Sequence, residues 1–103
     1  MNWMNVALEQ EFAEGSWRVV HIDNVSIMVL RVDGEFYAMK DECTHDGSPL
    51  SDGELEGCEM ICPWHGARFD VRNGHVLAPP AYEDVPVYPV RVIDGMVQVT
   101  ISP

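Results

Sequence analysis

The sequence predicts an all-β fold, an antiparallel sandwich or barrel that carries a site built from loops. Three dipeptides typical of tight hairpin turns, Asp33-Gly34, Asn73-Gly74 and Asp94-Gly95, are each flanked by apolar and β-branched residues. Such turns need positive φ at both central positions, which these residue types tolerate. Residues 41–68 differ, being rich in Gly, Asp, Glu, Cys and His and poor in strand pattern. We therefore expect a loop-built site inserted between strands of a β scaffold.

Each strand is predicted from a short run of β-branched and aromatic residues between turn signals. The expected strands are, in order, Trp17–Ile22, Val25–Val32, Phe36–Met39, Phe69–Val71, His75–Leu77, Val90–Ile93 and Met96–Ile101. The last of these alternates apolar and polar residues, which is typical of a strand with one buried face. Val6–Phe12 is the one stretch that could be helical, and Gly15 would end it.

The length and the charge limit what the chain can be. Its 103 residues fit a single domain, 1–103, in which we expect a base scaffold of residues 1–40 and 82–103 and a cluster-binding subdomain of residues 41–81. The formal net charge of −11 argues against nucleic acid, which binds basic surfaces. It favours either a docking partner with a basic face or simply solubility.

Nothing in the sequence indicates a membrane span or a secretory signal. No apolar run approaches the ~18 residues of a transmembrane helix, and residues 1–5 have neither a basic region nor a cleavage site. Three cysteines are an odd number, which argues against a disulfide framework. We therefore expect a cytoplasmic protein.

Two short segments pair a cysteine with a histidine. Cys43-Thr44-His45 is followed, sixteen residues later, by Cys62-Pro63-Trp64-His65. Two such segments on neighbouring loops supply four ligands to one metal centre. Zinc is one candidate, although zinc fingers usually group cysteine with cysteine and histidine with histidine. The mixed pairing suits a dinuclear centre with both cysteines on one iron and both histidines on the other.

This signature resembles that of Rieske proteins, and the whole chain is most similar to the Rieske-type ferredoxins of bacterial aromatic-ring dioxygenase systems. Ser51-Asp52-Gly53 resembles the segment between their ligand pairs, and Ala78-Pro79-Pro80 resembles their proline loop over the cluster. The resemblance implies a Rieske-like β scaffold and one 2Fe–2S cluster. It implies Cys43 and Cys62 on the buried iron, and His45 and His65 on the outer one.

The departures from the respiratory Rieske proteins concern the reduction potential. Those proteins have two further cysteines, joined in a disulfide, where this chain has Ser48 and Trp64. They also have Ser and Tyr hydroxyls beside the cluster where this chain has Ala67 and Phe69. Hydrogen bonds to sulfur favour the reduced cluster, so their loss predicts a potential near the bottom of the Rieske range of roughly −150 to +300 mV.

The resemblance implies a one-electron carrier rather than an enzyme, passing electrons from a reductase, expected to be a flavoprotein, to a terminal oxygenase. Two alternatives stay open: a small Rieske-like subunit of another redox enzyme such as nitrite reductase, and a zinc-stabilised interaction domain. Cys58 is expected to be a free thiol, and His21 and His75 to be ordinary strand residues. Trp64 is expected to shield the cluster, with docking as the second possibility.

Overall fold

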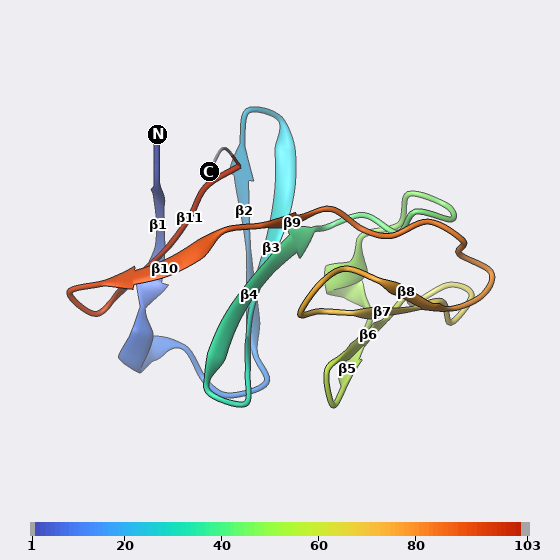
Figure 1. Ribbon diagram of the computed structural model, residues 1–103, viewed down its shortest axis with the longest axis horizontal. Helices are drawn as coiled ribbons and strands as arrows, with labels where there is room; N and C mark the ends of the chain where they lie inside the picture. Colours follow the sequence, from blue (N-terminus) through green and yellow to red (C-terminus); the bar gives the residue numbers. More distant parts are fainter. Residues whose placement is uncertain (1, 102–103) are drawn as a thin grey trace.

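A computed structural model describes residues 2–101, which form three antiparallel sheets (Figure 1). The first sheet has the strand order β1-β11-β10. Its strands are β1 (Met4–Leu8), β10 (Val90–Ile93) and β11 (Met96–Val99). The two ends of the chain's β structure therefore pair with each other, through contacts such as Met4 opposite Val99.

The second sheet, β2-β3-β4-β9, forms the rest of the base. It contains β2 (Trp17–Ile22), β3 (Val25–Val32), β4 (Glu35–Lys40) and the two-residue β9 (Val87–Tyr88). The strand β3 is the most buried, because it pairs with β2 on one side and β4 on the other. The return strand β9 pairs with β4 through Ala38–Tyr88 and Met39–Val87, so the chain leaves and re-enters the base at one place.

The third sheet, β5-β6-β7-β8, lies beside the base and is made only of residues 54–78 (Figure 1). Its strands have three residues each: β5 (Glu54–Glu56), β6 (Glu59–Ile61), β7 (Arg68–Asp70) and β8 (Val76–Ala78). A short 3₁₀ turn, η2 (Leu50–Asp52), precedes β5, and a similar turn, η1 (Glu9–Glu11), follows β1. Figure 1 shows the first sheet at the opposite end of the molecule.

Two hydrophobic cores correspond to this arrangement. One core joins the first sheet to one face of the second, with Phe12, Ile27 and Val97 among its buried residues. The other joins the opposite face of β3 to the third sheet, and it includes both Met28 and Phe69. The alternating side chains of β3 thus enter both cores, because successive residues of a strand point to opposite faces. The strand β3 therefore contributes to both cores and packs the third sheet against the base.

Most predicted strands are confirmed, but Val6–Phe12, the stretch that could be helical, contains only the short 3₁₀ turn η1. Residues 4–8 pair with β11 instead, and a register irregularity between Asn5 and Ala7 precedes the η1 turn. Strand pairing satisfies the backbone groups here, and Phe12 is buried in the core, so tertiary contacts override the local pattern. The sequence analysis also missed β1, β5, β6 and β9, all of which are five residues or shorter.

The turn predictions are confirmed in two cases of three. Asp33-Gly34 and Asp94-Gly95 have positive φ at both positions. At Asn73-Gly74 only the glycine does, because the Asn73 side chain accepts a hydrogen bond from the His75 backbone N–H and shapes a longer turn. A fourth tight turn, Asp23-Asn24 between β2 and β3, was not singled out, although both residues tolerate positive φ. Within residues 2–101, no helix has the length and apolar character needed to cross a membrane.

Candidate metal centre

The first Cys-His segment forms a tight loop between β4 and η2. The Cys43 backbone N–H donates to the Ser48 carbonyl at 2.8 Å, and the Gly47 N–H donates back to the Cys43 carbonyl at 2.8 Å. Gly47 has φ +78°, a conformation that residues with a Cβ rarely adopt. The closed turn buries Cys43 and leaves His45 and Asp46 exposed at its tip.

The second segment, between β6 and β7, repeats this backbone pattern. The Cys62 N–H donates to the Ala67 carbonyl at 2.8 Å, and the Gly66 N–H donates to the Cys62 carbonyl at 3.2 Å. Gly66 has φ +75°. Each glycine stands four residues after its cysteine, although the histidines stand two and three residues after. The structure therefore aligns the two loops by cysteine and glycine.

The four predicted residues meet at the tips of these two loops. The Cys43 and Cys62 sulfurs and an Asp46 carboxylate oxygen all lie within 4.8 Å of one another. A ring nitrogen of His45, one of His65 and an Asp46 oxygen form a second group within the same limit. The two imidazole rings are 5.1 Å apart, centroid to centroid, and perpendicular. Two buried thiols thus face two exposed imidazoles.

The electrostatics of the thiols suit a cationic centre. Burial raises the pKa of the Cys43 thiol, and the neighbouring Cys62 sulfur raises it further. The backbone N–H groups of His45 and Asp46 act in the opposite direction and lower this pKa. Two adjacent buried thiols become thiolates when a metal compensates their charge. Two thiolates and two imidazoles are the donor set of a Rieske 2Fe–2S centre, so the residues present fit that group.

Contacts from both sides hold the first loop in place. The Asp41 carboxylate, just before Cys43, accepts hydrogen bonds from the Ser51 N–H at 2.7 Å and the Ser51 hydroxyl at 2.6 Å. The Trp17 indole N–H donates to the Ser51 carbonyl at 3.2 Å, which ties the base to η2. The Thr44 hydroxyl donates to the Glu83 carbonyl at 2.7 Å. The last contact fastens the loop to the segment that follows the Pro79–Pro80 cis peptide bond.

Two acidic residues next to the first ligand pair, Asp41 and Asp46, accept hydrogen bonds from nearby residues of the chain. Asp41 binds Ser51, as described, and Asp46 Oδ1 accepts the Ser48 N–H at 2.9 Å. The pKa of Asp46 is lowered, first by Ser48 and to a lesser degree by His65, whose Nδ1 is 3.3 Å from Asp46 Oδ2. Sequence reasoning did not single out this contact with both ligand pairs. The sequence feature that could have revealed the contact is that Asp46 and His65 each directly precede a glycine of a turn.

The remaining cysteine and histidines lie outside this group. Cys58 is half-buried in the β5–β6 turn, with its sulfur 4.0 Å from an Asp33 carboxylate oxygen. His21 Nδ1 is 2.9 Å from the Ser26 hydroxyl on the neighbouring strand, and His75 is exposed. Trp64 is 73% exposed, which favours docking over shielding of the centre as its role.

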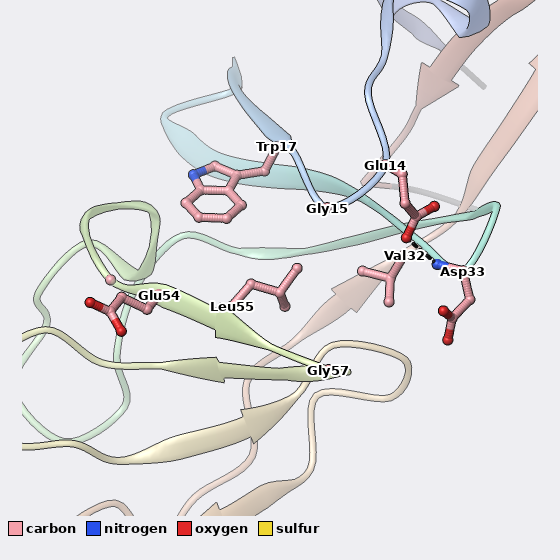
Figure 2. Close-up of a pocket in the computed structure, with 9 residues that line it drawn as sticks. Glu14, Gly15, Trp17, Val32, Asp33, Glu54, Leu55 and Gly57 are labelled. Carbon is pink, nitrogen blue, oxygen red and sulfur yellow. Dashed lines mark hydrogen bonds between the residues drawn. The ribbon is translucent and has the colours of Figure 1, made fainter.

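Figure 2 shows a surface groove between the base and β5. Apolar side chains of Trp17, Val32 and Leu55 line it together with acidic groups. The Glu14 carboxylate there accepts hydrogen bonds from the backbone N–H groups of Asp33, at 2.6 Å, and Gly34. None of the four predicted ligands lines this groove. Its Trp17 and Leu55 side chains pack on the core that contains both cysteines, so the groove marks the junction of base and third sheet.

A β scaffold that presents buried thiols and exposed imidazoles on two matched loops fits the class of iron–sulfur electron-transfer proteins. The model of the Rieske [2Fe-2S] domain matches residues 2–89. The chain belongs to this family and carries one Rieske-type 2Fe–2S cluster.

Curated relatives have closely matching lengths. The ferredoxin component of the naphthalene 1,2-dioxygenase/salicylate 5-hydroxylase systems of a Ralstonia species is 40% identical over 91 residues, which is 88% of each chain. The ferredoxin component of the naphthalene 1,2-dioxygenase system of Pseudomonas aeruginosa is 35% identical, over 97% of this chain and 96% of the relative. These relatives are named as ferredoxin components, and the present chain is likewise an electron carrier rather than a catalytic subunit.

The chain is similar both to a solved ferredoxin and to part of a solved terminal oxygenase. The ferredoxin of carbazole 1,9a-dioxygenase from Nocardioides aromaticivorans superposes with a TM-score of 0.90 at 30% identity, over 96% of this chain and 97% of that one. The terminal oxygenase from the same organism matches 98% of this chain, with a TM-score of 0.84 and 32% identity, but this covers only 30% of the oxygenase. The chain thus matches nearly the whole of that ferredoxin and about a third of that oxygenase.

Proposed function

We propose that Cys43, Cys62, His45 and His65 hold the 2Fe–2S cluster, with the cysteines on the inner iron and the histidines on the outer one. The observation that supports this assignment is the opposite burial of the two donor types within one site: both thiols are buried and both imidazoles are exposed. When bound, such a cluster accepts and releases one electron at a time. The exposed imidazole edges give the shortest route between the cluster and a partner.

We propose that the chain takes its electron from a reductase, a flavoprotein, and delivers it to a terminal oxygenase. One similar structure is a complex of reduced oxygenase and oxidized ferredoxin in carbazole 1,9a-dioxygenase, which matches this chain with a TM-score of 0.90 at 35% identity. That complex is of another protein, and it supports the same kind of acceptor here. The three free cysteines suit a reducing compartment, and we place the carrier in the cytoplasm.

The surface around the histidines is suited to a partner with a basic face. Residues 41–67 contain seven acidic residues and no Lys or Arg. The three basic residues nearest in sequence form ion pairs within the chain: Lys40 with Glu42, Arg68 with Glu56 and Glu59, and Arg72 with Asp70. Lys40 and Arg68 thus offset part of this charge, and the acidic excess that remains on the cluster side steers a basic partner towards the histidines.

Apolar contact adds to this charge. Within residues 2–101, the three most exposed large apolar side chains all lie in or next to the cluster-binding segment: Trp64 at 73%, Leu77 at 50% and Tyr82 at 84%. Exposed aromatic residues are typical of the centres of protein interfaces. Their position in and after the second ligand loop supports docking of the partner at the histidine end.

Ligand replacement tests the assignment. Cys43→Ser and Cys62→Ser should abolish the visible spectrum of the natively loaded protein and loosen residues 41–68, because metal binding and local folding are coupled. Cys58→Ser is the matched control and should keep the full spectrum. Loss of the spectrum on changing Cys58, or stoichiometric zinc in a colourless parent protein, would overturn the assignment.

A further inference from the structure

We propose that Asp46 keeps the reduction potential of the cluster low, by holding a negative charge against the ligand residues of both loops. The inference rests on the ligand set proposed above. It concerns a residue that is not itself a ligand in that set.

The position of Asp46 follows from the matched geometry of the two loops. In both loops the cysteine N–H is bonded to the carbonyl five residues on, and the glycine four residues on is bonded back to the cysteine. Counted from its cysteine, Asp46 stands in the first loop where His65 stands in the second. The Asp46 carboxylate of the first loop therefore lies at the position that the His65 imidazole occupies in the second loop.

The distances place this carboxylate next to all four proposed ligands. Asp46 oxygens lie within 4.8 Å of both cysteine sulfurs and within 4.8 Å of a ring nitrogen of each histidine. Within residues 2–101, it is the one residue common to both groups of potential metal ligands. The Ser48 N–H holds Oδ1 at 2.9 Å, and Oδ2 lies 3.3 Å from His65 Nδ1. The side chain is 22% exposed.

A carboxylate at this place opposes the addition of an electron. Two ferric ions and two sulfides carry +2, which two thiolates cancel, so that the oxidised centre is neutral and the reduced centre carries −1. A second negative charge nearby disfavours the reduced state. Salt screens this interaction little, because the separations are shorter than the Debye length of ~8 Å at physiological ionic strength.

Asp46→Asn removes the charge and keeps an oxygen that accepts the Ser48 N–H. Voltammetry of the loaded protein should show reduction favoured about tenfold, which is an upward shift of ~59 mV for a one-electron couple. The shift should persist at high salt. Glu35→Gln, at the start of β4, removes one charge far from the loops and should shift the potential much less.

Asp46→Ala separates charge from hydrogen bonding, because alanine adds no donor that could reach a cluster sulfur. It also provides the test if the Asn variant loads poorly. Raised potentials in the loaded variants, with the Rieske EPR signal retained, support the proposal. An Ala variant at the parent potential, or a shift no larger than that of Glu35→Gln, would overturn it. These outcomes are distinguishable from failure of the ligand assignment, because in that case the parent protein itself would lack the Rieske EPR signal.

Discussion

The absence of hydroxyl groups at two apolar residues beside the cysteines, Ala67 and Phe69, is one expected contribution to a low potential, and Phe69→Tyr tests it directly. Phe69 is fully buried in the same core as Cys43 and Cys62. The substitution adds one hydroxyl at the end of the ring. If that hydroxyl donates to a cysteine sulfur, it stabilises the reduced cluster more than the oxidised one, because the extra negative charge makes sulfur a better acceptor.

The expected shift follows from the strength of a hydrogen bond to a charged group. A differential gain of ~1–2 kcal/mol corresponds to an increase of roughly 40–90 mV in potential, since 59 mV is a tenfold change for one electron. Ala67→Ser should act in the same direction. Ala67 is fully buried, and its carbonyl accepts the Cys62 N–H at 2.8 Å, so a serine there stands beside that cysteine.

Voltammetry at low and high salt is the assay, with Phe12→Tyr as the matched control. Phe12 is equally buried but lies in the other core, so its hydroxyl should leave the potential unchanged. A Phe69→Tyr hydroxyl without an acceptor would instead cost ~1–3 kcal/mol of stability, or about 4–8 °C in Tm for each kcal/mol. An unchanged potential with a lowered Tm would refute the hydrogen-bond argument. Strong salt dependence in every variant would assign the low potential to the acidic surface instead.

Three further predictions concern the scaffold. Gly53→Ala should destabilise the protein and weaken its retention of the cluster, because an added Cβ would collide with the Ile61 carbonyl, next to the second ligand loop. Thermal unfolding and the loss of visible absorbance on heating measure this effect. An unchanged Tm would contradict it. Asp70→Asn should cost about 1–3 kcal/mol in urea unfolding at pH 7, since it breaks a two-point contact with Arg72. Arg72 lowers the pKa of the buried Asp70, so its contribution to stability is present above the unfolded pKa near 3.9 and is lost as pH falls through the lower folded value. The unfolding free energies of parent and variant should therefore become equal in acid. A difference in stability that persists in acid would disprove the ionic origin. Cys58 should react with a thiol reagent in the loaded protein without bleaching the cluster, and bleaching in step with labelling would show that it supports the centre.

The longer strands and the ligand residues were predictable, because they depend on local signals. The strands Trp17–Ile22 and Val25–Val32 were predicted with their observed bounds, since a run rich in β-branched and apolar residues marks each one. Cys43 and Cys62 stood out by their spacing to histidine. The matching potential-tuning positions, Ala67 and Phe69, were found only through resemblance, and the structure places both in the core with the cysteines.

What could not be predicted depends on contacts between distant segments. The strand β1 forms because residues 4–8 find β11 some ninety positions away, a pairing with no local signal. The three-residue strands of the third sheet are likewise too short to show a period. The equivalence of Asp46 and His65 was hidden because the histidine spacing differs between the loops. It became visible only when the backbone hydrogen bonds aligned the loops by their glycines.

The central claim is that the two exposed imidazoles, His45 and His65, are ligands of the cluster, and pulsed EPR of the reduced, histidine-¹⁵N-labelled protein tests it most directly. The account predicts two strongly coupled ligand nitrogens, which persist unchanged in a His21→Gln, His75→Gln double variant. Absence of such couplings in the parent, or their loss on replacing His21 and His75, would contradict it.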